Sequence, residues 1–130
     1  MNKSVSAVLV AAGASRRMGF DKLTAELGSK TVLEKSIEAF DTHPYITELV
    51  LVAGENMPWV ESLAKKCHKS VKVVRGGATR AQSVRHGVMA AKGELLAIHD
   101  AARPFVKENI ITEALQAAAR MGAAAPAVPV

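Results

Sequence analysis

Three polar segments of the sequence carry residues that could do chemistry, and the first spans residues 11–22. It opens with small residues, so that backbone N–H groups can approach an anion closely and surround it. Arg16 and Arg17 then add positive charge, and Lys22 adds a mobile ammonium group. The segment lacks the Gly-Lys-Ser/Thr of a Walker A loop and the glycine spacing of a dinucleotide fingerprint. We interpret it as a loop that binds a nucleotide triphosphate, the alternative being an ordinary strand–helix turn with solvated basic residues.

The second segment, residues 76–83, reads GGATRAQS. Its two glycines permit close contact with a planar ligand, and nearby backbone groups could read the edge of a base. Arg80 and Ser83 place donors at the start of a predicted helix, whose dipole favours anions. The same residues are equally consistent with a turn in which Thr79 caps the helix. The segment by itself therefore leaves base recognition and a structural turn open.

The third segment, residues 98–105, reads IHDAARPF. Asp100 follows a predicted buried strand, where a carboxylate can bind a divalent cation or a ribose hydroxyl. Mg²⁺ prefers carboxylate and phosphate oxygens, and a nucleotide can supply most of them. We favour one of these roles for Asp100, whereas Arg103 can pair with Asp100 or face a substrate phosphate. We expect His99 to cap or pack rather than to catalyse.

Apolar runs alternate with amphipathic runs along the chain, which is typical of a parallel sheet with helices on both faces. The predicted strands are Val5–Val10, Glu48–Ala53, residues 71–74 and residues 95–99. The predicted helices are residues 31–40, 58–67, 79–91 and Glu108–Met121. Ligands of such sheets bind beyond the carboxyl ends of the strands, so the three polar segments should meet at one edge.

The last residues, AAAPAVPV, form an apolar run broken by Pro126 and Pro129. Proline removes a hydrogen-bond donor from a central strand, so we expect a strand that leads out of the sheet. The expected fold is therefore a Rossmann-like, mostly parallel α/β sheet that is incomplete at its C-terminus. Residues 1–130 are expected to form a single, partial domain.

The composition limits the class of protein. A chain of 130 residues with 49% hydrophobic and 22% charged residues suits one globular domain. No apolar run is long enough to cross a bilayer, and we interpret the N-terminal run as a buried strand rather than a signal peptide. Cys67 is the single cysteine, which excludes an internal disulfide and suits a reducing compartment. We therefore predict a cytoplasmic protein without a membrane partner.

The net charge of +5 and the pI near 9.6 are compatible with nucleic acid, an anionic surface or small phosphorylated ligands. The basic residues are expected in turn-like segments, and no helix carries a continuous basic stripe. Aromatic residues make up only 4% of the chain, which leaves little on which bases could stack. We predict a small phosphorylated ligand and no nucleic-acid partner. The four histidines show no spacing typical of metal ligands.

The motifs AAGASRRMGFDK, GG-x-x-R-x-x-S and HDAARPF, in this order, resemble those of 2-C-methyl-D-erythritol 4-phosphate cytidylyltransferases. The first motif marks only the wider nucleotidyltransferase superfamily, whereas HDAARPF is highly specific, and the resemblance covers essentially the whole chain. It implies cytidylyl transfer from CTP to 2-C-methyl-D-erythritol 4-phosphate, with release of pyrophosphate, in non-mevalonate isoprenoid precursor biosynthesis.

The resemblance also implies roles for individual residues. Positions that match nucleotide-binding residues are Ala11, Ala12, Gly13, Ser15, Gly77, Arg80, Ser83, Asp100 and Ala101. Arg17 matches a catalytic ligand of the triphosphate, and Lys22 matches the catalytic group on the α-phosphate. Asp100 also matches a position near Mg²⁺, and Arg103 one near the methylerythritol phosphate. Two residues depart from the pattern: Ser15 stands where a glycine is usual, and Ala78 where an acidic residue is common.

Chains of this family continue well beyond the length of this one. The resemblance therefore leads us to expect that a C-terminal substrate-binding and dimerisation part is absent here, and that the full-length protein is a homodimer. The implied partners are CTP and a polyol phosphate, and the implied cofactor is Mg²⁺ or another divalent cation. Two alternatives stay open: a ribitol-5-phosphate cytidylyltransferase, which tends to carry AGG in place of AAG, and a non-catalytic CTP-binding fragment.

Overall fold

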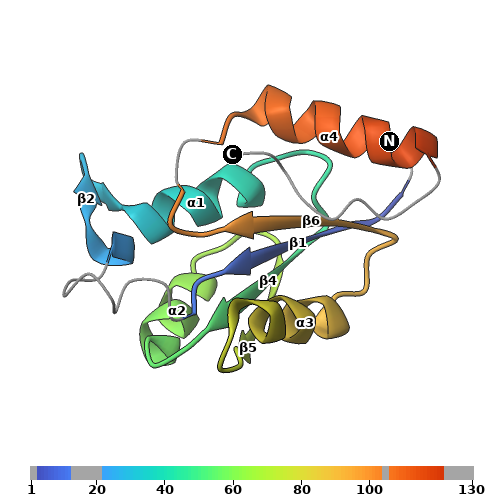
Figure 1. The fold of residues 1–130 in the computed structure, drawn as a ribbon. Helices are drawn as coiled ribbons and strands as arrows, with labels where there is room; N and C mark the ends of the chain where they lie inside the picture. The colour runs from blue at the N-terminus through green and yellow to red at the C-terminus, as the bar shows by residue number, and fades with distance from the viewer. Residues whose placement is uncertain (1–2, 13–21, 104–105, 122–130) are drawn as a thin grey trace.

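A computed structural model describes residues 3–12, 22–103 and 106–121, and its centre is a parallel β-sheet (Figure 1). The four strands of this sheet are β1 (Val5–Val10), β4 (Glu48–Ala53), β5 (Ser70–Arg75) and β6 (Leu95–Asp100). They lie in the order β5-β4-β1-β6, and each neighbouring pair is parallel. The predicted Rossmann-like α/β fold with a mostly parallel sheet is confirmed.

Helices cover the two faces of this sheet unequally. The helices are α1 (Val32–Asp41), α2 (Met57–Ala64), α3 (Arg80–Ala90) and α4 (Glu108–Met121). Buried side chains from α1, α2 and α4 share one large core with the sheet, represented by Phe40, Val60 and Leu115. On the opposite face α3 packs on a small cluster around Val8 (Figure 1). The prediction of helices on both faces is thus confirmed, with one layer much larger than the other.

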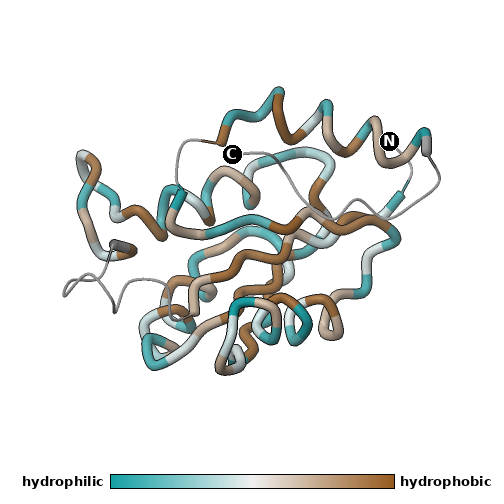
Figure 2. The backbone as a smooth tube through the Cα atoms, in the orientation of Figure 1, coloured by the Kyte–Doolittle hydropathy of each residue, from teal (hydrophilic) through white to brown (hydrophobic). Residues whose placement is uncertain are grey.

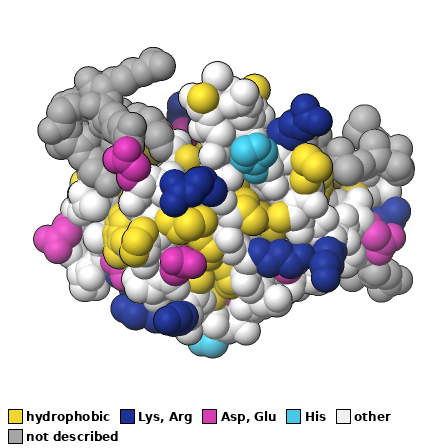
Figure 3. Space-filling view, turned by 90° about the horizontal axis from the view of Figure 1, so that it is seen from below, with side chains coloured by type: hydrophobic (Ala, Val, Ile, Leu, Met, Phe, Trp, Pro, Cys, Tyr) yellow, Lys and Arg dark blue, Asp and Glu magenta, His cyan; other side chains and the backbone are white. Residues whose placement is uncertain are grey.

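The central strands β1 and β4 are buried along their whole length because both of their faces are covered, and their two polar residues, Ser6 and Glu48, are hydrogen-bonded to each other. Every residue of β1 and of β4 is buried, and Figure 2 shows hydrophobic residues concentrated along the middle of the sheet. The edge strand β6 alternates instead, with Leu95, Ala97 and His99 buried and the residues between them half-buried. Seen from the side that α3 covers, hydrophobic side chains reach the surface beside basic ones (Figure 3).

Helix α3 lies very close to the sheet because Gly87 has no side chain. A Cβ atom at this position would stand 2.5 Å from Cγ1 of Val8 and 2.8 Å from Cγ2 of Val52. Any larger residue would push the helix away from β1 and β4. The absence of a side chain at Gly87 therefore lets α3 pack directly on β1 and β4.

Several element bounds differ from the predictions. Helix α2 ends at Ala64, three residues earlier than expected, because residues 65–69 turn to enter β5. Strand β5 is longer by one residue at each end, and β6 extends to Asp100. The predicted C-terminal strand falls mainly on residues 122–130, which lie outside the described part.

A short hairpin after residue 22 was not predicted. Its two antiparallel strands are β2 (Glu26–Leu27) and β3 (Lys30–Thr31), with Gly28 at a φ of 71° in the turn. The 3-10 helix η2 (Lys22–Thr24) precedes the hairpin. Two-residue strands are too short to show an alternating pattern in the sequence. Among the described residues, no helix has the length and apolar character needed to cross a membrane.

Candidate functional site

The three polar segments start side by side at the carboxyl edge of the sheet. Three backbone hydrogen bonds continue the strand ladders past the strand ends: Ala11 N to Val52 O at 2.7 Å, Gly76 N to Ala53 O at 2.8 Å, and Ala101 N to Val10 O at 3.0 Å. Each bond joins a residue of one segment to a neighbouring strand. The predicted meeting of the segments is confirmed for their described residues.

Asn56 holds the beginning of the first segment in place. Its amide nitrogen donates to Ala11 O at 3.2 Å, and its Oδ1 accepts from Gly54 N at 3.0 Å. Asn56 directly precedes α2, but its side chain does not cap this helix because it forms these two hydrogen bonds at the sheet edge. The sequence analysis did not single out Asn56. The sequence feature that could have indicated it is a polar side chain two residues after Gly54, the glycine that follows β4.

Parts of the first segment fall outside the described residues. This applies to Gly13, Ser15 and Arg17, and also to the side chain of Lys22, whose backbone begins η2. The next residue, Leu23, is buried in the core and fixes η2 beside α1. The roles implied for Gly13, Ser15, Arg17 and Lys22 therefore stay predictions.

The second segment is shaped by the first turn of α3. Ser83 is buried, and its Oγ accepts from Gly77 N at 3.2 Å, while Gln82 Oε1 accepts from Ala78 N at 2.7 Å. Thr79 caps the helix by accepting from Gln82 N, as one of the two sequence interpretations expected. Base recognition by this segment stays a prediction. Gln82 was missed, although it directly precedes the expected Ser83.

Both glycines of the second segment are required by packing. A Cβ atom at Gly76 would stand 2.5 Å from Ser83 Oγ and 2.8 Å from the Cβ of Ala12. A Cβ atom at Gly77 would stand 2.4 Å from the Cβ of Gln82. The first and second segments are therefore in close contact at Ala12 and Gly76.

Asp100 ends β6 and connects the second and third segments. Its Oδ1 accepts from Ala102 N at 3.0 Å. Its Oδ2 lies 3.5 Å from Arg80 Nη1 and 4.0 Å from Arg103 Nε. Both arginine side chains are more than half exposed, so these ion pairs are screened and weak, and both guanidinium groups stay accessible to an anion. The pairing of Arg103 with Asp100, one of its two expected roles, is confirmed.

Two buried side chains hold the turn that follows Asp100. His99 Nε2 lies 2.7 Å from Arg103 O, and since a carbonyl only accepts, Nε2 carries the proton. The imidazole packs on Phe40 with 5.2 Å between ring centroids, and burial lowers the pKa of His99, which keeps it neutral. The expectation that His99 packs is confirmed. Ser36 of α1 donates to Ala101 O at 2.6 Å, a contact that the sequence analysis missed.

The residues present suit a divalent cation that arrives with a nucleotide. No group of three or more metal-ligating side chains exists among the described residues. Asp100 nevertheless directs one carboxylate oxygen, Oδ2, away from the backbone of its own turn. Mg²⁺ is commonly bound by one or two carboxylates together with substrate phosphates and water. Among the described residues, Asp100 thus fits as a carboxylate ligand of such a metal ion.

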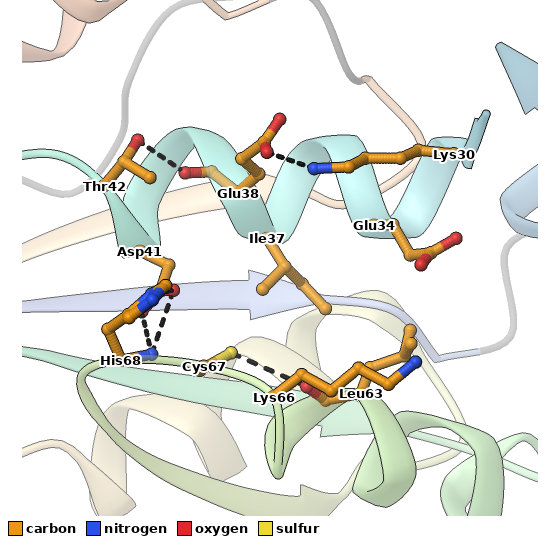
Figure 4. A pocket seen from close by; sticks show the side chains of 10 residues that line it. All are labelled: Lys30, Glu34, Ile37, Glu38, Asp41, Thr42, Leu63, Lys66, Cys67 and His68. Carbon is orange, nitrogen blue, oxygen red and sulfur yellow. Dashed lines mark hydrogen bonds and ion pairs between the residues drawn. The ribbon is translucent and has the colours of Figure 1, made fainter. Parts of the chain in front are cut away.

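A pocket of about 230 Å³ lies elsewhere, between α1 and the residues that follow α2 (Figure 4). Its carboxylates already have partners: Asp41 accepts from the backbone N–H groups of His68 and Lys69, and Glu38 pairs with Lys30. The pocket runs along α1, and none of its lining residues belongs to the three polar segments. It is therefore separate from the site formed by the three segments.

Comparison with known proteins identifies the family. The sequence profile of 2-C-methyl-D-erythritol 4-phosphate cytidylyltransferase matches residues 5–130. The chain is 39% identical to the enzyme of this name from Clostridium tetani, over 90% of this chain and 50% of that one. It is 42% identical to the one from Caldanaerobacter subterraneus, over 98% of this chain and 60% of that one. The chain thus spans about half the length of the curated relatives it matches.

A solved structure agrees with the sequence comparison. The crystal structure of 4-diphosphocytidyl-2C-methyl-D-erythritol synthase from Anaerococcus prevotii superposes with a TM-score of 0.77 at 29% identity. The superposition covers 88% of this chain and 50% of that one. The chain belongs to the 2-C-methyl-D-erythritol 4-phosphate cytidylyltransferase family.

Proposed function

We propose that the complete protein transfers a cytidylyl group from CTP to 2-C-methyl-D-erythritol 4-phosphate and releases pyrophosphate. The reaction belongs to isoprenoid precursor biosynthesis. The observation that carries the proposal is the junction of all three motif segments at one sheet edge, within the region that matches the family. The family match favours methylerythritol phosphate over ribitol phosphate as the acceptor.

The proposed chemistry is a direct displacement at phosphorus. An oxygen of the acceptor's phosphate attacks the α-phosphorus of CTP, and the bond from this phosphorus to the oxygen bridging to the β-phosphate breaks. Pyrophosphate leaves with that oxygen, and no covalent intermediate on the protein is needed. The work of the protein is to position two anions and to offset their charge.

The described residues supply part of that charge. The exposed guanidinium groups of Arg80 and Arg103 flank Asp100 at the sheet edge, where they can attract phosphate groups. We assign Arg103 to the acceptor phosphate and Arg80 to the nucleotide. Lys22 begins η2 at the end of the first segment, and with Arg17 it is assigned to the triphosphate on the basis of the resemblance.

Asp100 is the residue proposed to hold a divalent cation, through Oδ2. When bound, this cation would offset negative charge on the phosphate oxygens. Gly77 and Ser83 are assigned to the cytosine on the basis of the resemblance of their motif. The bond from Gly77 N to Ser83 Oγ holds these two residues next to each other.

The oligomeric state, the partners and the cellular location are proposed from the family and the composition. We infer that the complete protein is a cytoplasmic homodimer that binds no nucleic acid, in keeping with its family and its single cysteine. Because the chain spans about half the length of its relatives, turnover is assigned to the complete protein. For residues 1–130 alone we propose CTP binding as a partial domain.

The test is an assay of pyrophosphate release by the complete protein, with CTP and each of the two polyol phosphates. We expect turnover with methylerythritol phosphate and little with ribitol 5-phosphate. The variant Lys22→Ala should lower kcat by about a hundredfold or more while the fold is retained. Turnover with ribitol 5-phosphate alone, or near-normal kcat in the variant, would contradict the assignment.

A further inference from the structure

The turn of residues 100–103, called here the Asp100 turn, is held from the protein interior by two side-chain hydrogen bonds. Ser36 Oγ donates to Ala101 O at 2.6 Å, and His99 Nε2 donates to Arg103 O at 2.7 Å. Both donors are almost fully buried: Ser36 is 0% exposed and His99 is 1% exposed. The two bonds are additional to those that the turn makes within itself.

These donors satisfy carbonyl groups that the sheet cannot reach. Asp100 is the last residue of β6 to pair with β1, so the carbonyls after it have no ladder partner. Ala101 is fully buried, and a buried carbonyl without a donor is costly. Ser36 and His99 therefore give the Asp100 turn one preferred position relative to the core.

The position of the turn decides where Asp100 points. Its Oδ1 is bonded to Ala102 N inside the turn, so the carboxylate moves with the turn as one unit. The remaining oxygen, Oδ2, is the one that faces Arg80 and Arg103. A shift of the turn would move this oxygen and both ion pairs together.

Ser36 connects the turn with the first segment. It lies on α1, which packs against η2, and the backbone N–H of Val32 at the start of α1 donates to Ala25 O at 2.8 Å. Leu23 of η2 is buried in the same core as α1. Helix α1 is thus one rigid element that contacts both the residues after Lys22 and the Asp100 turn.

We propose that His99 and Ser36 are positioning residues, which hold the Asp100 turn so that Asp100 and Arg103 meet the metal-bound nucleotide and the acceptor phosphate. The inference rests on the proposed function for the identity of these ligands. It differs from a packing role, because a packing role would require only the ring of His99 and the volume of Ser36. The positioning role requires in addition that His99 and Ser36 each donate a hydrogen bond to the turn.

The experiment compares His99→Phe and Ser36→Ala with the control His43→Phe in the complete protein. His43 is also 1% exposed and packs on an aromatic ring, Tyr45, but its nitrogens bond Tyr45 N and Thr112 Oγ1, away from the Asp100 turn. The control loses two hydrogen bonds. His99→Phe loses one, since within the described part of the chain His99 Nδ1 has no partner. His99→Gln restores a donor near the position of Nε2.

Two readouts are needed. The first is amide hydrogen exchange at Ala102 and Arg103, whose N–H groups are bonded within the turn. The second is the affinity for CTP with Mg²⁺ or Mn²⁺, together with kcat and KM for both substrates. Exchange tests the positioning whether or not the protein binds CTP, so it separates failure of this inference from failure of the proposed function.

We expect His99→Phe and Ser36→Ala to speed exchange at both amides and to weaken metal–CTP binding about tenfold or more, as is usual for residues that orient a ligand. His99→Gln should recover most of this loss. His43→Phe should lower the unfolding temperature at least as much, yet leave the turn amides and CTP affinity within about twofold of the parent protein. Unchanged exchange in His99→Phe, or equal effects of the His99 and His43 variants on the turn, would overturn the inference.

Discussion

Replacement of Asp100 by asparagine separates the structural work of this carboxylate from its proposed role toward the nucleotide. In Asp100→Asn the oxygen that accepts from Ala102 N can be kept, so the turn should survive. What disappears is the negative charge that faces Arg80 at 3.5 Å and Arg103 at 4.0 Å. The substitution therefore removes the proposed metal ligand and two ion pairs with little change in shape.

The expected loss of stability is small. The two arginine side chains are 56% and 61% exposed, and ion pairs of this kind contribute between zero and about 1 kcal/mol each. Because two such pairs are lost, we expect the free energy of unfolding to fall by at most about 2 kcal/mol. Affinity for CTP in the presence of Mg²⁺ should fall by about tenfold or more, equivalent to about 1.4 kcal/mol, because the proposed metal site would lose a carboxylate ligand.

The assay is calorimetric titration of CTP into the complete protein, with Mg²⁺ and with a chelator. In the parent protein Mg²⁺ should strengthen binding, and in Asp100→Asn this enhancement should be lost. A conservative control is Glu94→Gln, which changes an exposed carboxylate at the other end of β6. If Asp100→Asn bound CTP with the affinity and metal dependence of the parent, the placement of the cation at Asp100 would be wrong.

Three further outcomes follow from the packing and the buried titratable groups. Burial lowers the pKa of His43 below its usual 6.5, so the folded state binds a proton less readily than the unfolded state. The free energy of unfolding should therefore fall as the pH drops below about 6.5. Denaturant titrations across this pH range should show a smaller decrease in the variant His43→Gln. Burial, with a smaller contribution from Asp41, raises the pKa of the Cys67 thiol to about 11. Alkylation of this thiol near pH 8 should therefore be roughly two hundred times slower than alkylation of a free cysteine. An alkylation rate close to that of glutathione would contradict this prediction. Gly87→Ala should lower the free energy of unfolding by about 1–3 kcal/mol through its clash with Val8, and thermal unfolding that matches the parent would show that α3 adjusts freely.

The sheet and its main helices could be predicted from the sequence because their signals are local. The runs Val5–Val10 and Glu48–Ala53 are strands with the predicted bounds, since a strand covered on both faces is mostly apolar. Helix Glu108–Met121 also has its predicted bounds, because its apolar residues recur at helical spacing. The hairpin of β2 and β3 carries no such pattern, and tertiary contacts with α1 decide it.

Local patterns could likewise mark the three site segments but not the side chains that support them. Asp100, Gly76 and Thr79 stand out because each follows a strand or begins a helix. Ser36 and Asn56 do not stand out, because their partners lie 65 and 45 residues away in the chain. A serine on a helix or an asparagine before one has many ordinary uses, and only the folded chain shows which backbone oxygen it contacts.

The sequence by itself thus determined the order of the main strands and helices along the chain, the edge of the sheet where the three polar segments meet and the family to which the chain belongs. These depend on residue types at short spacing, which hydrophobic burial and backbone geometry translate directly into elements. Only the tertiary structure decided that Ser83 and Gln82 shape the second segment, that Arg80 faces Asp100, and that α1 supports the Asp100 turn. Hydrogen bonds of this kind form between groups that are distant in the chain, and their partners are selected by packing rather than by the local pattern.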